Sequence, residues 1–482
     1  MMLSELLEPL PVPRDVPFSG MTLDSRSVRP GDLFCAIAGT ETDGHRFIED
    51  AVARGAVGIL LESSEGLAGD ASTAVVVGDL RARVGEFASR FYGHPSRSMT
   101  VAAVTGTNGK TSVSHYIAAA LSDCGATAGV VGTLGAGRLS ALEPFGLTTP
   151  DAISLQRYLA AMRDEGLNAV ALEASSHGLA QGRLGGTAVD VAVFTNITRD
   201  HLDYHPDFDA YRDAKHALFL KPDLGAAVVN VDDPAGVTFA ATNNAKQTVR
   251  VSISDSSADL YCSRCDLLKD GLLLDVVTPW GGGEIESALL GGFNVMNLLL
   301  TVGVLGVLGH AWDDIKGAAA RTRNVRGRMD RVAHASEQQG PAVIVDYAHT
   351  PDALALVLQA LRAHVEGELW CVFGCGGDRD VGKRPQMGLI ADTHADRVVI
   401  TDDNPRFESS EEIIRDILAG CRHQSDIHVI PDRAAAINYA LRAAREQDMV
   451  LVAGKGHERF QDVRGERLAF DDYVVIRKVS ID

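Results

Sequence analysis

Residues 99–112 read MTVAAVTGTNGKTS, and this stretch decides the fold. Its mostly apolar first half predicts a buried strand, and Gly106 and Gly109 then permit a tight backbone turn before a helix. In such a turn, backbone N–H groups can face phosphate oxygens, Lys110 can reach the terminal phosphates, and Thr111 can ligate Mg²⁺. The loop is shorter than the general G-x-x-x-x-G-K-[ST] pattern, and a simple glycine-rich turn is the alternative. Strand, glycines, lysine, threonine and helix in this order favour a nucleotide site.

Apolar runs and helical patterns alternate on both sides of this loop. Strands are predicted at 57–61, 74–77, 169–172, 189–195, 226–231, 342–345, 369–373, 397–401, 427–430 and 449–453. Helices are predicted at 80–92, 295–308, 351–361 and 434–444, and a small antiparallel excursion at 251–290. This alternation predicts an α/β fold of three domains: 1–97, a central P-loop domain with a mostly parallel sheet at 98–330, and a C-terminal Rossmann-like, doubly wound domain at 331–482.

Bulk composition narrows the class of protein. The 482 residues carry 45 Lys and Arg against 64 Asp and Glu, so the net charge of −19 disfavours nucleic acid and anionic lipid as partners. The N-terminus lacks the pattern of a signal peptide, and the apolar stretch 295–309 is short for a membrane span. Seven sparse cysteines fit a reducing compartment. We therefore expect a cytoplasmic protein. A zinc site at Cys262 and Cys265 is the weaker alternative, since it needs four ligands.

Polar residues follow several predicted strands, where ligands gather in parallel sheets. Glu173 and His201 follow two strands of the central region, so both can approach the phosphates and a Mg²⁺ ion. Lys215 lies on a helical pattern, and its sequence context alone indicates a solvated surface charge.

Four strand ends of the last region carry charged and amide side chains. The segments are DYAHTPD at 346–352, GCGGDRDVGKRP at 374–385, DDNPRFE at 402–408 and GKGHE at 454–458. Arg379 and Arg406 can hold carboxylate, and Glu458 can hold ammonium, which suggests a zwitterionic ligand.

These motifs together resemble the Mur ligase family. The resemblance rests on LDSRSVRPGDLF at 23–34, TGTNGKTS at 105–112, LTTPD at 147–151, EASSHGL at 173–179, NITRDHLDYH at 196–205, YRDAKHALF at 211–219, GFNVMN at 292–297, GRMD at 327–330, and the four C-terminal segments. It implies domains for uridine nucleotide, ATP and amino acid. It also implies a ligase of peptidoglycan precursor synthesis that joins meso-diaminopimelate to the D-glutamate γ-carboxylate of UDP-N-acetylmuramoyl-L-alanyl-D-glutamate through an acyl phosphate, with ATP and Mg²⁺.

The resemblance also implies roles for single residues. It gives ATP contacts to Gly106, Thr107, Asn108, Gly109, Lys110, Thr111, Ser112, Asn294, Asn297, Arg328 and Asp346. It assigns binding of the UDP-linked substrate to Leu23, Ser25, Thr148, Thr149, Ser175, Gln181 and Arg183. It assigns binding of diaminopimelate to Arg379, Asp403, Asn404, Pro405, Arg406, Gly454 and Glu458. Lys215 resembles the lysine that the family carries as a carbamate (N6-carboxylysine), and it joins Thr111, Glu173 and His201 as a metal ligand. Leu147 departs from the family pattern, which often has Asn there.

Two other functions remain open at this point. A folylpolyglutamate synthetase would share the chemistry, although DNPR at 403–406 and the segment at 23–34 disfavour it. A non-catalytic, nucleotide-dependent scaffold would not release phosphate together with a new amide bond. We expect small-molecule substrates and a monomer.

Overall fold

The computed structural model describes residues 1–39, 43–63, 74–334 and 340–479. The chain forms two compact units. The first comprises Met1–Ser252, Ser257–Leu260 and Leu299–Ala318, and the second comprises Ile253–Ser256, Tyr261–Leu298 and Ala319–Asp482. The predicted domain boundaries near residues 97 and 330 stay predictions.

The N-terminal part of the first unit is built on a four-stranded parallel sheet. Its strands are β1 (Gly20–Thr22), β2 (Asp32–Ala36), β3 (Gly58–Leu61) and β4 (Ala74–Val76), in that order. The helices are α1 (Leu3–Leu7), α2 (Ile48–Ala53) and α3 (Leu80–Phe91). The predicted strands at 57–61 and 74–77 and the helix at 80–92 are confirmed, while β1 and β2 were not predicted.

The rest of the first unit holds a larger sheet in the order β12-β11-β10-β5-β9-β6-β7-β8. Strands β12 to β6 pair in parallel, and β7 and β8 add an antiparallel edge. The bounds are β5 Thr100–Thr105, β6 Ala128–Gly132, β7 Gly135–Arg138, β8 Ala141–Glu143, β9 Ala169–Glu173, β10 Val191–Phe194, β11 Ala226–Asn230 and β12 Gln247–Ser252. Strands β9, β10 and β11 are wholly buried, and β5 is buried except at its first residue, Thr100, which explains their mostly apolar sequences.

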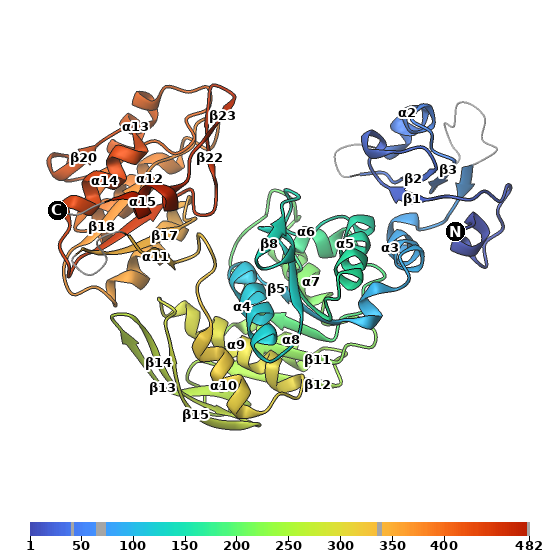
Figure 1. Ribbon diagram of the computed structural model, residues 1–482, viewed down its shortest axis with the longest axis horizontal. Coiled ribbons are helices and arrows are strands. Elements are labelled where there is room, and N and C mark those ends of the chain that lie inside the picture. The colour runs from blue at the N-terminus through green and yellow to red at the C-terminus, as the bar shows by residue number, and fades with distance from the viewer. Residues whose placement is uncertain (40–42, 64–73, 335–339, 480–482) are drawn as a thin grey trace. The chain divides into compact units, whose positions relative to one another are not determined.

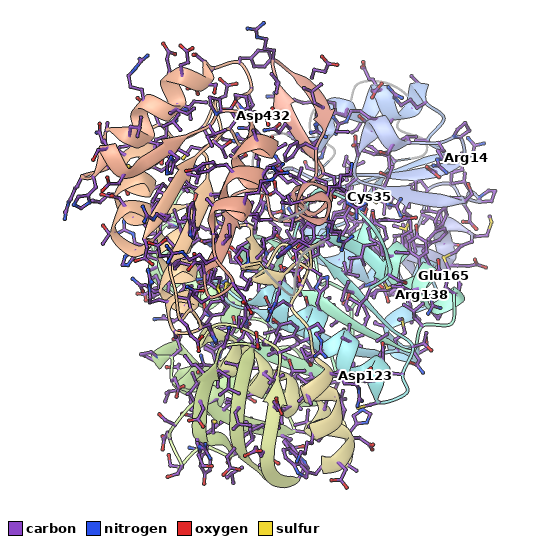
Figure 2. All side chains as sticks on the ribbon, turned by 60° about the vertical axis from the view of Figure 1, so that its left-hand side comes forward. Arg14, Cys35, Asp123, Arg138, Glu165 and Asp432 are labelled. Carbon is purple, nitrogen blue, oxygen red and sulfur yellow. The ribbon has the colours of Figure 1, made fainter. Side chains whose placement is uncertain are left out.

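Helices cover this sheet and anchor its edge. They are α4 (Lys110–Asp123), α5 (Ala152–Asp164), α6 (Ser176–Ala180), α7 (Phe208–His216) and α8 (Pro234–Ala241). At the edge, Arg138 at the end of β7 donates from Nη2 to the carbonyl oxygen of Glu165 after α5 at 2.9 Å, and Figure 2 labels both residues. Helix α9 (Phe293–Val307) is largely buried, as predicted, and α10 (Trp312–Arg321) follows it.

An antiparallel meander and a doubly wound sheet form the second unit. The meander of β13 (Leu260–Leu268), β14 (Gly271–Thr278) and β15 (Gly281–Ser287) confirms the antiparallel excursion. The sheet has the order β16-β17-β21-β18-β19-β20, parallel except for β16. Its bounds are β16 Asp330–Arg331, β17 Ala342–Asp346, β18 Leu369–Phe373, β19 Arg397–Ile400, β20 Ile427–Val429 and β21 Met449–Ala453.

Helices pack on both faces of this six-stranded sheet, as Figure 1 shows around β17 and β18. Side chains alternate between two cores because successive residues of a strand point to opposite faces. Ile344 joins the core formed with α11 (Pro351–Arg362), α12 (Lys383–His394) and α13 (Ser410–Leu418). Val343 and Val345 join the core formed with α14 (Arg433–Ala443) and α15 (Asp472–Lys478). The α/β, doubly wound prediction is confirmed.

A two-stranded hairpin was not predicted. It consists of β22 (Phe460–Val463) and β23 (Glu466–Ala469), which lie between β21 and α15 in the chain. None of its residues is buried, so the sequence lacks the apolar alternation that marks a core strand. Within the described residues, the helices are all too short or too polar to cross a bilayer.

Candidate active site

The phosphate loop forms the predicted strand, turn and helix. Strand β5 leads into Gly106, whose φ of +151° and surroundings require glycine, since a Cβ there would lie 1.9 Å from Thr195 Oγ1. Lys110 Nζ donates to the carbonyl oxygens of Gly106 at 2.9 Å and Thr107 at 2.8 Å. Asn108 donates its backbone N–H to Asn196 Oδ1 at 3.0 Å. The ammonium group therefore lies against the loop that would receive the phosphates.

Glu173 is a buried carboxylate at the end of β9, with only 1% of its surface exposed. Its Oε2 accepts hydrogen bonds from Thr111 Oγ1 and Thr133 Oγ1, both at 3.0 Å. Its Oε1 accepts the backbone N–H of Thr133 at 2.9 Å. A carboxylate beside a hydroxyl is an oxygen-rich donor set that suits Mg²⁺. The structure thus brings Thr111 and Glu173 together, as the predicted metal site requires.

Thr133 was missed in the sequence. It follows β6 directly, so the rule that ligands gather at the carboxyl ends of parallel strands could have found it. A lone hydroxyl gives a weaker signal than a carboxylate or a histidine.

Lys215 is buried, so its interpretation as a solvated surface charge is wrong. Helix α7 holds it against the phosphate loop, where Nζ donates to the Gly106 carbonyl oxygen at 2.8 Å and lies 4.4 Å from the centre of the Tyr211 ring. Burial, and secondly the charge of Lys110, lower the pKa of Lys215 to about 6, although Asp200 opposes the shift. The amine is therefore mostly neutral at pH 7, which is the form that reacts with carbon dioxide to give a carbamate.

His201 lies in a cluster of aromatic rings. Its backbone is left-handed, with φ of +53°, and Nε2 lies 3.5 Å from Asp200 Oδ2. Its ring centre lies 4.7 Å from that of His177 and 6.1 Å from that of Tyr211. Burial and the neighbouring histidines lower the pKa of His177. Among the described residues, no hydrogen bond joins His201 to Thr111 or Glu173, so its predicted place in the metal site stays a prediction.

A pocket of about 770 Å³ in the first unit collects four of the residues predicted to hold the UDP-linked substrate. Leu23 and Ser25 reach it from the N-terminal part, and Gln181 and Arg183 reach it from the loop after α6. Cys35, which Figure 2 labels, also lines it. Its volume lies in the range of small-molecule sites.

Hydrogen bonds run from this pocket to the phosphate loop. Arg183 Nη1 donates to the Thr149 carbonyl oxygen at 2.6 Å, and Thr149 Oγ1 donates to the Glu173 carbonyl oxygen at 2.7 Å. Ser175 donates its backbone N–H to Thr149 Oγ1 at 3.0 Å. In parallel, the hydroxyl oxygens of Thr133 and Thr148 lie 3.1 Å apart, within hydrogen-bond distance. The structure therefore connects the predicted substrate residues to the carboxylate that faces Thr111.

Four predicted nucleotide contacts belong to the second unit. Asn297 Nδ2 donates to Asn294 Oδ1 at 2.9 Å, and the Arg328 guanidinium lies 4.9 Å from the centre of the Tyr347 ring. Asp346 accepts the backbone N–H groups of Met329 and Ala348, each at 2.7 Å. Burial raises the pKa of Asp346 against these favourable contacts. The four residues form two local groups, and their role in ATP binding stays a prediction.

The residues predicted to bind diaminopimelate gather at the strand ends of the second unit. Arg406 follows β19, and its Nη1 donates to the Gly377 carbonyl oxygen at 2.6 Å. Asn404 Nδ2 donates to Glu458 Oε2 at 3.0 Å, and Asp403 is buried. Pro405 and Arg406 line a pocket of about 720 Å³ together with Asp432, which Figure 2 labels. Arg379 lies in the neighbouring loop after β18, where its Cγ would be 3.8 Å from a Cβ at Gly376.

Gly454 gives a first test of this site. Its φ is +107°, and a Cβ would lie 2.5 Å from Asp403 Oδ2. We expect Gly454→Ala to cost about 1–3 kcal/mol in strain and to displace Asp403. The Michaelis constant for the amino acid should then rise while the constant for ATP changes little. Gly78→Ala is the matched control, because a Cβ there meets nothing within 4 Å. Equal Michaelis constants for the amino acid in the two variants would contradict the assignment of Gly454 and Asp403 to the amino-acid site.

Among the residues that it describes, the structure places no further ligand that could complete a metal site beside Cys262 and Cys265, the two cysteines of the zinc alternative. Cys262 Sγ lies 2.7 Å from the Arg264 carbonyl oxygen. Across the described part of the chain, no group of three or more His, Cys, Asp or Glu side chains could hold a metal ion. A Mg²⁺ ion at Glu173 would therefore take most of its ligands from water, substrate phosphates or a modified lysine.

Comparisons with known proteins place the chain in a family. Three family models match the chain: the Mur ligase family, catalytic domain, at residues 17–92; the Mur ligase middle domain at 104–305; and the Mur ligase, glutamate ligase domain, at 327–456. The UDP-N-acetylmuramoyl-L-alanyl-D-glutamate–2,6-diaminopimelate ligase of Xylella fastidiosa (strain 9a5c) is 48% identical over 99% of this chain and 97% of its own length.

Solved structures agree as well. A structure of a ligase with that same name has a TM-score of 0.76 and 37% identity, covering 99% of this chain and 98% of its own. A folylpolyglutamate synthase of Mycobacterium tuberculosis, complexed with ADP and AMPPCP, has a TM-score of 0.61 and 18% identity over 78% of this chain, so it shares the fold alone. The matched models and the extent of identity show that the chain belongs to the Mur ligase family.

Proposed function

We propose that this ligase joins meso-diaminopimelate to the D-glutamate γ-carboxylate of UDP-N-acetylmuramoyl-L-alanyl-D-glutamate, at the expense of ATP. The reaction would serve peptidoglycan precursor synthesis in the cytoplasm, and the protein would act as a monomer. The observation that supports it most is the set of hydrogen bonds from the pocket at Arg183, through Thr149 and Glu173, to Thr111 at the phosphate loop.

The reaction follows from what these side chains can do. The γ-carboxylate attacks the terminal phosphorus of ATP, the bond from that phosphorus to the bridging oxygen breaks, and the products are an acyl phosphate and ADP. The amine of diaminopimelate then attacks the acyl carbon, phosphate leaves, and the amine loses a proton. Both reactants of the first step are anions, so Lys110 lowers the barrier by its charge and by its position over the loop. Arg183, Thr149 and Ser175 hold the muramoyl-peptide so that its carboxylate approaches the phosphates.

Mg²⁺ would be held by Thr111 and Glu173, with His201 and the carbamate of Lys215 as further ligands, and it would neutralise phosphate charge. Glu173 fits this role because it is buried beside a hydroxyl. Lys215 fits it only as a carbamate, because Mg²⁺ takes oxygen ligands and the unmodified lysine side chain offers only a nitrogen.

The folylpolyglutamate synthetase alternative is less well supported. The match of a Mur ligase model at 17–92 covers the N-terminal sheet, which carries Leu23 and Ser25 of the proposed uridine-nucleotide pocket. The DNPR segment, whose Arg406 lines the pocket of the second unit, also supports the diaminopimelate ligase.

The choice of amino acid gives a sharp prediction. meso-Diaminopimelate carries one more carboxylate than L-lysine, and an arginine can bind a carboxylate with two parallel donors. The Arg406 side chain is 22% exposed, and its Nε lies 4.0 Å from Asp462 Oδ2. Lysine would leave the guanidinium without the second carboxylate that diaminopimelate brings. We expect discrimination of about a hundredfold in kcat/KM, and Arg406→Ala should raise the Michaelis constant for diaminopimelate far more than that for ATP.

The matched control is Arg415→Ala, an exposed arginine on α13. Steady-state kinetics would give kcat/KM for diaminopimelate and for L-lysine in the wild type, Arg406→Ala and Arg415→Ala. If Arg406→Ala left the ratio between diaminopimelate and L-lysine unchanged, Arg406 would merely stabilise the turn that contains it.

A further inference from the structure

A buried lysine lies under the proposed amino-acid contacts. Lys455 follows β21, and its side chain is fully buried. Its Nζ donates to Asn404 Oδ1 at 3.0 Å and to Glu458 Oε2 at 3.1 Å. Asn404 Nδ2 donates to the same Oε2 at 3.0 Å. Hydrogen bonds therefore join the three side chains pairwise in a closed ring.

The ring fixes the orientation of the Asn404 amide. Its Oδ1 also accepts the backbone N–H of Asp462, in β22, at 3.0 Å. Turning the amide over would place its NH₂ group against the Lys455 ammonium and against an N–H donor, which leaves donors facing donors. Lys455 and β22 together therefore hold the Nδ2 of Asn404 toward Glu458.

Lys455 also offsets the negative charge of this region. Asp403 is buried, and burial raises its pKa, while Lys455 and Arg433 oppose that rise. Glu458 is a second carboxylate close to Lys455 and Asp403. A carboxylate held away from water is costly without a cationic partner. Because none of its side chain is exposed, Lys455 itself cannot contact a bound amino acid.

We propose that Lys455 is a positioning residue: directly and through the Asn404 amide, it holds the Glu458 carboxylate in the one arrangement that recognises the ammonium group of the incoming amino acid. This inference rests on the proposed function, since it takes Asn404 and Glu458 as amino-acid contacts. Burial alone would raise the pKa of Glu458, but Lys455 and the hydrogen bond from Asn404 bring it below its ordinary value. The charged or titratable groups around Glu458 are Lys455, His457, Asp403, Arg433 and Tyr347.

Lys455→Met tests the inference, because methionine keeps the unbranched apolar stem of the side chain and removes its charge and donors. We expect the Michaelis constant for diaminopimelate to rise about tenfold or more, as for other groups that orient a contact residue. The constants for ATP and the UDP-linked dipeptide should stay within about twofold. In a plot of kcat/KM for diaminopimelate against pH, the acidic limb should move to higher pH, since Glu458 loses the cation that keeps it ionised. Lys269→Met, at an exposed lysine of the same unit, is the control.

A double-mutant cycle with Glu458→Gln separates positioning from a general effect on the fold. If Lys455 acts through Glu458, Lys455→Met should have a much smaller effect in the Glu458→Gln enzyme than in the wild type. Additive effects, an equal rise in all three Michaelis constants, or an unmoved pH profile would overturn the inference. So would a failure to fold by both Lys455→Met and Lys455→Gln, which would make the lysine structural. A wild-type enzyme that does not use diaminopimelate would overturn the proposed function instead.

Discussion

Lys110→Ala should abolish ligation and leave the fold intact. The ammonium group of Lys110 lies within 2.9 Å of two carbonyl oxygens of the phosphate loop, where it can reach the terminal phosphates of ATP. Removing a charge aimed at the reacting group lowers kcat by about 10²–10³ or more, because the two anions of the first step are no longer shielded from each other. Phosphate release coupled to amide formation would measure the loss.

The matched control is Lys246→Ala, at an exposed lysine of the same unit. Circular dichroism and thermal unfolding should match the wild type in both variants, because the phosphate loop that Lys110 contacts is also held by β5 and by the bond from Asn108 to Asn196. Near-normal product formation by a folded Lys110→Ala enzyme would refute the phosphate-loop assignment.

Lys215→Ala should lose most of the activity, and excess bicarbonate should not restore it. The neutral amine of Lys215 attacks carbon dioxide, a C–N bond forms, and a proton is released, which leaves an N-carboxylate. A buried amine whose pKa is about 6 favours this reaction at pH 7, and acidification below pH 6 should reverse it by protonating the amine. The carbamate would convert a largely neutral amine beside the phosphate loop into an anion that can ligate Mg²⁺.

Labelling tests this directly. Wild-type enzyme in ¹³C-bicarbonate should show a carbamate resonance that Lys215→Ala lacks. Lys221→Ala is the control, because Lys221 is a partly buried lysine in the same unit and its Nζ donates to the Leu184 carbonyl oxygen at 3.2 Å. Active wild-type enzyme with a permanently unmodified Lys215 would count against the carbamate.

The fold was predictable where the sequence carries continuous apolar runs. Strands such as β9 and β18 are wholly buried, so their sequences have no polar interruptions. The β22–β23 hairpin was not predictable in this way, because it is held by the loop that contains Arg406. The backbone N–H of Arg406 donates to the Asp462 carbonyl oxygen at 2.9 Å, and Arg464 donates its N–H to the Arg406 carbonyl oxygen at 2.7 Å. A contact between segments so far apart in the chain leaves no local pattern.

The candidate site was predictable in part for the same reason. Glu173 follows a buried strand, so its position alone indicated a ligand group. Lys215 lies on an amphipathic helix whose pattern indicates a solvated face. Its burial depends on the packing of α7 against the phosphate loop, where the Tyr211 hydroxyl lies 2.8 Å from Thr107 Oγ1. Only the resemblance to the Mur ligases gave that lysine a role. Lys455 stood in the quoted GKGHE segment, but its bonds to Asn404 depend on a loop about 50 residues away in the chain.

The central claim is that phosphate release from ATP is tied to one new amide bond, between the UDP-linked dipeptide and meso-diaminopimelate. The most direct measurement incubates the enzyme with ATP, Mg²⁺, the UDP-linked dipeptide and a panel of amino acids, and quantifies phosphate and product together. We predict equal amounts of phosphate and UDP-linked tripeptide with meso-diaminopimelate, and little of either with L-lysine. Phosphate release without a new amide bond, or equal use of L-lysine, would contradict the account.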